Sequence, residues 1–230
     1  GAGNDTFYFT DANLDAGHVL NGGEGTDTLK MDDLSAVADS QLENNTSIEV
    51  LTADATGLSA TLDEYAQAMG LTTITLTGTS ANGVTDTITL QDDLTNAITV
   101  NLDVLESGGD DVNSVVATTY TGDLTVNTAT SVSISKASAN DFVLTGGTGT
   151  SDTLNFHGGT FTATNLGGVT LIENWIQSDD AAASLTLADA NIADGKALTI
   201  DLRTRLDTSL AGTVNLVDDT NGISTVHGGT

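Results

Sequence analysis

Cysteine is absent from this chain, and basic residues are scarce. Without cysteine there is no disulfide framework and no thiolate ligand for a metal. Lysine and arginine together number 5 against 32 acidic residues, which gives a formal net charge of -27. So few cations cannot neutralise a run of phosphates, so nucleic acid and anionic membranes are not expected partners. No apolar run approaches the ~20 residues of a membrane-spanning helix, and the N-terminus lacks a signal-peptide pattern.

The acidic residues are nearly all aspartate. Six of the 32 are glutamate, so 32 − 6 = 26 are aspartate. Aspartate is a poor helix and strand former that concentrates in turns, and its short carboxylate suits hard cations. We therefore expect the acids to lie in loops, where they repel one another unless counterions or bound metals intervene. At 230 residues the chain is long enough to bury a core.

The stretch NGGEGTDTLKM, residues 21–31, places three glycines and an aspartate in front of a short apolar strand. Glycine allows positive φ angles that turn backbone carbonyls inward, and the aspartate adds a carboxylate. The pattern G-G-x-G-x-D-x-U-x, where U is apolar, recurs along the chain. One copy is complete, with Gly22, Gly23, Gly25, Asp27 and Leu29. Another keeps its last four defined positions, Gly1, Gly3, Asp5 and Phe7. A third has Gly146, Gly147 and Gly149 with Asp152 one residue late, and Gly228 and Gly229 begin a fourth.

These turns resemble the calcium-binding repeats of the RTX family, whose nonapeptides build parallel β-helices. The resemblance implies that turn carbonyls and aspartate carboxylates hold Ca²⁺. The metal residues it implies are Gly1, Gly3, Asp5, Gly22, Gly23, Gly25 and Asp27, with a further set at Gly146, Gly147, Gly149 and Asp152. The alternative is a set of glycine and aspartate loops without metal.

Asp5 and Asp27 are 27 − 5 = 22 residues apart, which is one family coil of two nonapeptides with about four residues inserted. Their turns are therefore expected to stack and to share one Ca²⁺. Between them, TDANLDAGHVL is expected to supply an opposite turn and a short strand at Val19 and Leu20.

A longer repeat overlies the short one. Residues 22–55 and 146–181 share a glycine turn, a D-T-L strand, a variable loop and an Ile-Glu strand. We expect residues 1–29 to form an RTX-like β-roll coil, residues 22–145 a first long β unit, and residues 146–230 a second that ends in a truncated motif. The chain begins and ends within glycine motifs, so a longer parent chain is expected.

Threonine-rich alternation of polar and apolar residues predicts strands that bury one face. Such segments begin at residues 72, 86, 97, 124, 197 and 213. Their recurrence with like turns predicts an all-β fold. The predicted architecture is a parallel β-solenoid or β-roll with stacked calcium-binding glycine turns. A β-sandwich is the alternative. One short helix is expected, because Thr61 and Glu64 form a capping box and Gly70 follows an apolar face.

Other patterns favour structural roles. Glu49 and Glu173 occupy equivalent places in two repeats, so they are not expected to face each other across a glycosidase cleft. His157 and His227 precede Gly-Gly, but the G-x-S-x-G serine of an esterase is absent.

Trp175 is expected in the core rather than on a carbohydrate platform. The T-x-T strands invite comparison with ice-binding surfaces, but their irregular spacing does not predict a flat array. Adjacent aspartates at 32–33, 92–93, 110–111, 179–180 and 218–219 are expected to be solvated turn residues.

These features predict a non-enzymatic, calcium-binding structural segment of a large secreted bacterial protein, of the surface-layer or adhesin type. The resemblance implies type I secretion, an extracellular or cell-surface location, and folding and assembly on Ca²⁺ binding. Expected partners are calcium ions, further copies of the chain in a lattice or fibre, and cell-surface polysaccharide, with no membrane insertion. The alternative is a non-catalytic or polysaccharide-binding part of a secreted RTX enzyme, with Arg203 and Arg205 as its close cationic pair. A third interpretation is adaptation to high salt.

Overall fold

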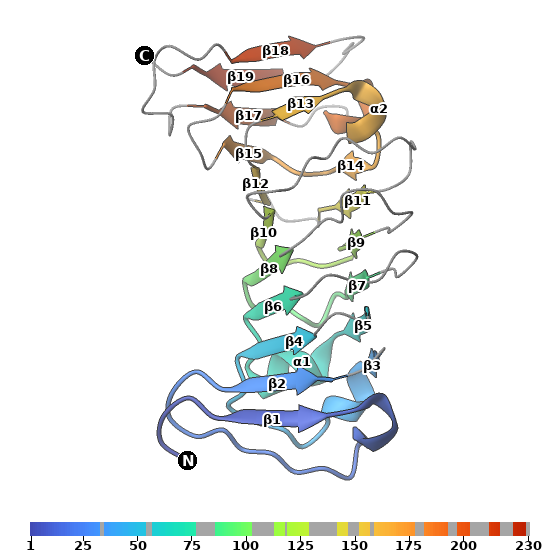
Figure 1. Cartoon of the computed structure of the whole chain (residues 1–230), viewed down its shortest axis with the longest axis vertical. Coiled ribbons are helices and arrows are strands. Elements are labelled where there is room, and N and C mark those ends of the chain that lie inside the picture. The colour runs from blue at the N-terminus through green and yellow to red at the C-terminus, as the bar shows by residue number, and fades with distance from the viewer. Residues whose placement is uncertain are drawn as a thin grey trace.

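The chain forms an elongated stack of coils with its two termini at opposite ends (Figure 1). The computed structural model describes residues 1–32, 35–53, 57–76, 86–102, 113–117, 119–128, 142–146, 152–156, 159–177, 182–192, 197–202, 212–216 and 223–228. Strands dominate these residues, and helices are few and short. The predicted all-β solenoid is therefore the observed fold.

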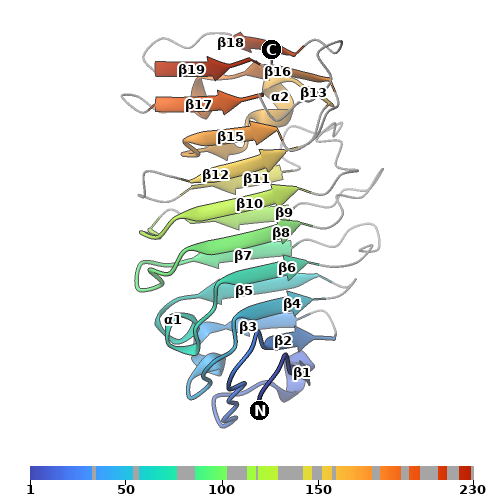
Figure 2. The same ribbon diagram turned by 90° about the vertical axis from the view of Figure 1, so that its left-hand side faces the viewer.

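One face of the stack is a ten-stranded sheet (Figure 2). Its strands, in spatial order, are β1 (Thr6–Phe9), β2 (Thr28–Met31), β4 (Val50–Ala53), β6 (Thr73–Leu76), β8 (Ile98–Leu102), β10 (Leu124–Thr128), β12 (Thr153–Phe156), β15 (Asn174–Gln177), β17 (Ala197–Asp201) and β19 (Ile223–His227). The registers Thr153↔Asn174 and Thr125↔Thr153 give the shortest and longest coils of this sheet, 174 − 153 = 21 and 153 − 125 = 28 residues. These coils are longer than the two nonapeptides of a β-roll.

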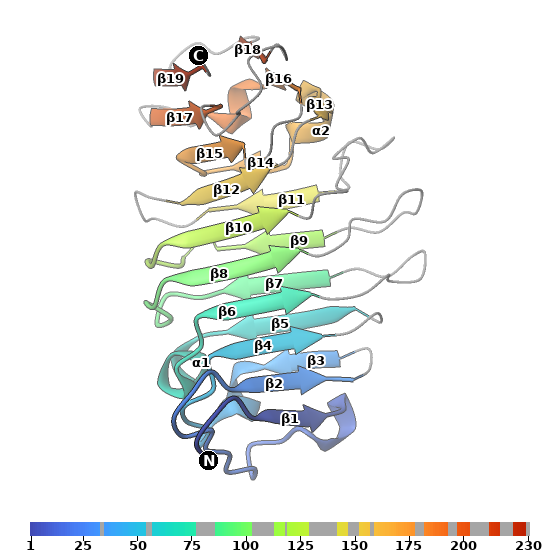
Figure 3. The same cartoon turned by 60° about the vertical axis from the view of Figure 1, so that its left-hand side comes forward.

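A second sheet forms the opposite wall of the solenoid (Figure 3). Its six strands are β3 (Ser35–Ala38), β5 (Leu58–Leu62), β7 (Asp86–Leu90), β9 (Asn113–Val116), β11 (Phe142–Thr145) and β14 (Val169–Thr170). Towards the C-terminal end lies a three-stranded sheet of β13 (Gly159–Phe161), β16 (Ala183–Leu187) and β18 (Thr213–Leu216). Every pairing between the described strands is parallel, which excludes the antiparallel β-sandwich.

The core is a set of apolar rows that run along the inside of the stack. Because side chains alternate across a strand, one residue per coil enters each row. One row contains Leu29, Leu51, Ile74, Val100, Val126, Leu154, Trp175 and Ile200, all buried. Each such large side chain stabilises the fold by about 1.5–3 kcal/mol relative to exposure. Trp175 is 1% exposed, so its predicted place in the core is confirmed.

The threonine-rich segments form strands as predicted. Strands β6, β7, β8, β10, β17 and β18 begin within one residue of the predicted starts at 72, 86, 97, 124, 197 and 213. Five of them bury one face where their side chains are described, as in β6, where Ile74 and Leu76 are buried and Thr73 and Thr75 are not. The exception is β18, in which no residue is buried and Leu216 is 41% exposed. The continuation of the segment beyond Thr128 lies outside the described residues.

Helix α1 (Glu64–Met69) is the predicted short helix, and Gly70 ends it with φ 96°. The predicted capping box is wrong, because Thr61 belongs to β5. The helix is capped instead from the preceding coil, where the Asp39 carboxylate accepts the amides of Asp63, Tyr65 and Ala66 at 2.8, 2.9 and 2.9 Å. The other helical segments are short: α2 (Ala163–Leu166) and the 3₁₀ turns η1 (Asp11–Asn13), η2 (Asp39–Leu42) and η3 (Asp189–Asn191).

Replacing Asp39 with alanine is expected to lower the free energy of unfolding by about 2 kcal/mol, because three amides at the start of α1 lose their acceptor. Urea unfolding followed by circular dichroism measures the change. Asp92→Ala is the control, because Asp92 is an exposed turn acid of the next coil. Equal losses in the two variants would show that a general charge effect, rather than capping, sets the stability.

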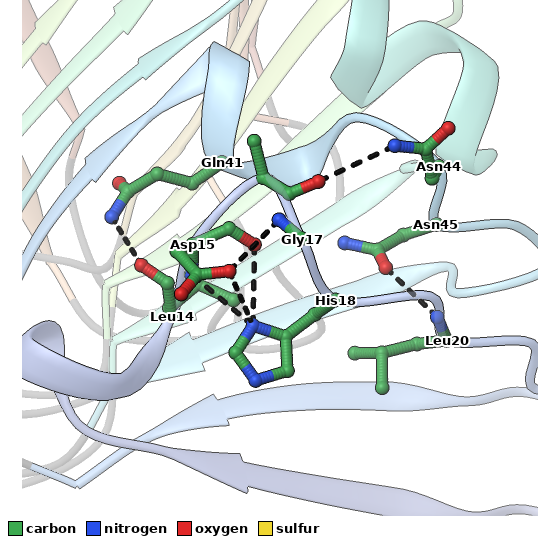
Figure 4. Close-up of polar contacts among 9 residues, drawn as sticks. Leu14, Asp15, Gly17, His18, Leu20, Gln41, Asn44 and Asn45 are labelled. Carbon is green, nitrogen blue, oxygen red and sulfur yellow. Dashed lines mark hydrogen bonds and ion pairs between the residues drawn. The ribbon is translucent and has the colours of Figure 1, made fainter.

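The segment between β1 and β2 does not form the short strand expected at Val19 and Leu20. Val19 is 75% exposed. The amide of Leu20 donates to the side-chain oxygen of buried Asn45 at 3.0 Å, and Gln41 Nε2 donates to the carbonyl of Leu14 at 2.6 Å (Figure 4). Side chains of the following coil and one isolated parallel bridge, between Asn21 and Thr46, therefore hold this segment in place of a continuous strand ladder.

Candidate metal centre

The glycine turns at residues 1–5 and 22–27 stack directly on each other. Gly3 donates its amide to the carbonyl of Glu24 at 2.7 Å, and the Glu24 amide donates to the carbonyl of Gly1 at 3.2 Å. The following strands continue this register, with Thr6 opposite Thr28. The predicted stacking of the two turns, 22 residues apart, is confirmed.

Two glycines of the second turn lie where no other residue fits. Gly23 and Gly25 have φ angles of 101° and 133°, in the region that favours glycine. A Cβ atom on Gly23 would lie 2.1 Å from the carbonyl oxygen of Gly1, and one on Gly25 would lie 2.3 Å from that of Gly3. The glycines therefore allow the two turns to approach within backbone contact.

Asp27 is the buried carboxylate of the stacked turns. Its side chain is 0% exposed. The Oδ1 atom accepts the amide of Asp5 in the preceding coil at 2.7 Å. The Oδ2 atom is buried and has no hydrogen-bond partner. A buried carboxylate oxygen without a partner is costly, so this atom marks a place where a positive or hydrogen-bonding group is missing.

Glu49 extends this arrangement to the next coil. Its Oε2 atom accepts the amide of Asp27 at 2.8 Å. In both contacts an acidic side chain accepts the backbone amide of the acid one coil earlier. Asp27 accepts the amide of Asp5, and Glu49 accepts the amide of Asp27. The contact gives Glu49 a structural role, as predicted, and the recurrence of Ile-Glu in both repeats is its signal in the sequence.

The second repeat reproduces the same contacts. Buried Asp152 accepts the amide of Leu124 through Oδ1 at 2.9 Å, and Glu173 accepts the amide of Asp152 through Oε2 at 3.2 Å. The residue inserted before Asp152 therefore does not displace its carboxylate from the turn. Gly147 and Gly149 of the predicted set lie outside the described residues.

The two repeats also share a carbonyl that faces the first glycine. A Cβ on Gly22 would lie 2.1 Å from the Ser47 carbonyl oxygen, and one on Gly146 would lie 1.9 Å from that of Leu171. Ser47 and Leu171 both have positive φ angles, 53° and 58°. These residues precede Glu49 and Glu173 by two positions, so each repeat brings a carbonyl and a carboxylate to one turn.

Two oxygens of the kind that calcium binds lie beside Gly22. Asp27 Oδ2 lies 2.2 Å and the Ser47 carbonyl oxygen 2.1 Å from the position of a Gly22 Cβ, so these two oxygens are at most 2.2 + 2.1 = 4.3 Å apart. One Ca²⁺ with oxygen ligands at about 2.4 Å spans such a separation. The donors are carboxylate and carbonyl oxygens, which calcium prefers.

The Asp5 carboxylate is the other acid of the predicted shared site. Its side chain is 46% exposed, and Oδ2 is 3.4 Å from the terminal ammonium of Gly1. In the described part of the chain no group of three or more His, Asp or Glu side chains is arranged to hold a metal. Further ligands at Asp27 would therefore be mainly backbone carbonyls, and a Ca²⁺ shared by Asp5 and Asp27 stays a prediction.

The other sequence candidates take structural places where they are described. His18 Nδ1 lies 3.1 Å from Asp15 Oδ1 (Figure 4). The His18 ring meets the Phe9 ring edge-on. The Asp93 amide donates to Asp63 Oδ1 at 3.0 Å. Burial, with the nearby carboxylates of Asp93, Asp39 and Asp92, raises the pKa of Asp63. The candidates outside the described residues are Asp33, His157, Arg203, Arg205 and the aspartate pairs at 110–111, 179–180 and 218–219.

No protein-family model matches the chain, and neither a curated protein nor a solved structure is significantly similar to it. Over the residues that the structure describes, no helix has the length and apolar character needed to cross a membrane.

Proposed function

We propose that the chain is a calcium-binding, non-enzymatic structural segment of a large secreted protein of the surface-layer or adhesin type. The observation that carries the proposal is the unpartnered Oδ2 atom of Asp27, buried beside a carbonyl in a stacked glycine turn. The contacts of Gly22 and Asp27 recur at Gly146 and Asp152, which supports a second site. The regular stack of parallel coils supports a structural role for the segment.

The chain's own residues would couple folding to calcium. The net charge of -27 opposes compaction, and burial of Asp27 adds an uncompensated carboxylate. Bound calcium supplies the positive charge that these oxygens lack. Asp5 and Glu49 fix the position of Asp27 through their contacts with its carboxylate and its amide. A solenoid built this way is unstable where calcium is scarce and stable where it is millimolar.

We also propose that the segment works outside the cell, exported by type I secretion, and that it assembles with other copies into a lattice or fibre. Calcium would neutralise part of the net charge of -27 and so reduce repulsion between copies. Sedimentation at high protein concentration in calcium tests assembly, because a stable monomer under those conditions contradicts it.

Far-UV circular dichroism in EDTA, followed by addition of millimolar Ca²⁺ or Mg²⁺ at fixed ionic strength, tests the calcium proposal. We expect the β signal, or its thermal midpoint, to rise with calcium and to rise much less with magnesium, which demands a smaller octahedral site. Calorimetric titration should show saturable calcium uptake. A protein that folds equally well in EDTA, or that responds alike to every salt, would support the metal-free or high-salt interpretations.

A further inference from the structure

The outer surface of the ten-stranded sheet carries an ordered row of threonines. In spatial order its members are Thr6, Thr28, Val50, Thr73, Thr99, Thr125, Thr153, Asn174, Thr199 and Thr225. Each residue is paired in register with the next, although the coils between them differ in length. The row therefore places one hydroxyl or amide per strand, about 4.8 Å from the next, along most of its length.

A second outward row runs beside the first, two residues further along each strand. Its members are Tyr8, Lys30, Thr52, Thr75, Asn101, Asn127, Asn155, Ile176, Asp201 and His227. Three asparagines in this row form a hydrogen-bonded chain. Asn155 Nδ2 donates to Asn127 Oδ1 and Asn127 Nδ2 donates to Asn101 Oδ1, both at 2.6 Å, and Asn101 Nδ2 donates to Thr75 Oγ1 at 3.2 Å.

The asparagine chain fixes these side chains, and within it Asn101 and Asn127 use only part of their hydrogen-bonding capacity. An asparagine amide has two N–H donors and an oxygen with two lone pairs. Asn127 uses one donor and one lone pair within the chain. Threonine is stiff at χ1, so the neighbouring hydroxyls are also held in place. The two rows therefore present oriented donors and acceptors at the spacing of the strands.

The middle of this surface carries no charge. The outward residues of β4, β6, β8, β10 and β12 are Val50, Thr52, Thr73, Thr75, Thr99, Asn101, Thr125, Asn127, Thr153 and Asn155, none of which is ionisable. The second row meets its nearest charges at Lys30 and Asp201. An acidic polymer would find no basic side chain in the middle of this surface. The net charge of -27 would also repel it.

We propose that this threonine and asparagine surface binds an uncharged polysaccharide, laid across the strands with about one sugar unit per strand. The strand spacing of ~4.8 Å is close to the length of one pyranose in an extended chain, so sugar hydroxyls meet the two rows in repeating fashion. Tyr8, 63% exposed, adds an aromatic ring at one end of the second row. The proposal goes beyond the calcium function and does not depend on it.

Two other occupants fit the surface less well. The strand direction turns along the stack, as the arrows of β1, β10 and β19 show in Figures 1 and 2, so the rows wind about the long axis. A flexible chain follows such a surface, whereas a flat ice face does not. A second copy of this chain brings another net charge of -27 against the surface, which opposes face-to-face pairing.

Affinity electrophoresis of the whole chain through gels that contain dextran, mannan or laminarin tests the proposal, with alginate as the acidic probe. The test variant is Thr125→Val with Asn127→Leu, which keeps the shape of β10 but removes its hydroxyl and amide. A neutral hydrogen bond is worth roughly threefold to tenfold in affinity, so the double variant should bind at least about tenfold more weakly. Thr89→Val, an outward threonine of β7 in the six-stranded sheet, is the matched control.

Circular dichroism and urea midpoints confirm that each variant keeps its fold. Retardation by at least one neutral polymer that the double variant loses and Thr89→Val keeps supports the proposal. Equal retardation of all variants, stronger retardation by alginate, or no retardation by any neutral probe overturns it. Ice growth inhibition or dimerisation that the double variant loses also overturns it in favour of those occupants. Asp27→Asn should leave retardation unchanged in a folded protein, which separates this result from the calcium proposal.

Discussion

Replacing Asp27 with asparagine is expected to reverse the sign of its effect on stability between EDTA and calcium. In EDTA, Asp27→Asn should raise the free energy of unfolding by about 1–3 kcal/mol, because it removes an uncompensated buried charge. The asparagine oxygen still accepts the Asp5 amide, and its NH₂ group faces the Ser47 carbonyl. In calcium at about 1,000 times the dissociation constant, the natural chain gains about 4 kcal/mol that the variant lacks. After the gain in EDTA is subtracted, the variant should be about 1–3 kcal/mol less stable than the natural chain.

Urea unfolding at fixed ionic strength, in EDTA and in millimolar Ca²⁺, measures both differences. Asp92→Asn serves as the control, because an exposed turn acid should change stability little and equally in the two conditions. Asp5→Asn tests whether Asp5 shares the ion. A partial loss of the stabilisation by calcium in this variant would show that it does. If Asp27→Asn shifts stability by the same amount with and without calcium, Asp27 is not a calcium ligand.

The strands could be predicted from the sequence because their signal is local. In β6 and β8 apolar residues alternate with threonine or asparagine, and this period of two places them on opposite faces of the sheet. The parallel arrangement followed from the recurrence of the glycine turn at Gly22 and Gly146. Both signals lie within a few residues of the feature that they predict.

Contacts between coils could not be predicted in the same way. Asp39 caps the helix at Glu64–Met69 through hydrogen bonds that span 24 to 27 residues. Gln41 binds the carbonyl of Leu14 over 27 residues. These contacts depend on the register of neighbouring coils, which no short motif encodes. A local capping box at Thr61 therefore seemed sufficient, although that residue is part of a strand.

The regularity of the outer surface was hidden by variable loop lengths. Thr99, Thr125 and Thr153 are separated by 125 − 99 = 26 and 153 − 125 = 28 residues, so their spacing in the sequence is irregular. In the sheet they are adjacent members of one row, because the turns between strands absorb the difference in length. Irregular spacing in the sequence therefore does not show how these threonines are ordered in the sheet. The turning of the strands still argues against a flat array.

Gly146 should be essential for a steric reason that holds whether or not calcium binds. A Cβ atom there would lie 1.9 Å from the carbonyl oxygen of Leu171 and 2.8 Å from Asp152 Oδ2. The Leu171 carbonyl belongs to the next coil's backbone, which cannot move without disturbing the ladder between β12 and β15. We therefore expect Gly146→Ala to lower the free energy of unfolding by about 3 kcal/mol in both EDTA and calcium.

Gly167→Ala is the matched control, because its Cβ would meet the nearest atom, the Ala163 carbonyl oxygen, at an ordinary 3.4 Å. That variant should be neutral or more stable by up to about 1 kcal/mol, since alanine restricts the unfolded chain. Urea midpoints for both variants decide the matter. A tolerated Gly146→Ala would mean that the coils separate easily at this turn. Loss confined to calcium would instead make Gly146 important for metal binding rather than for the approach of the two coils.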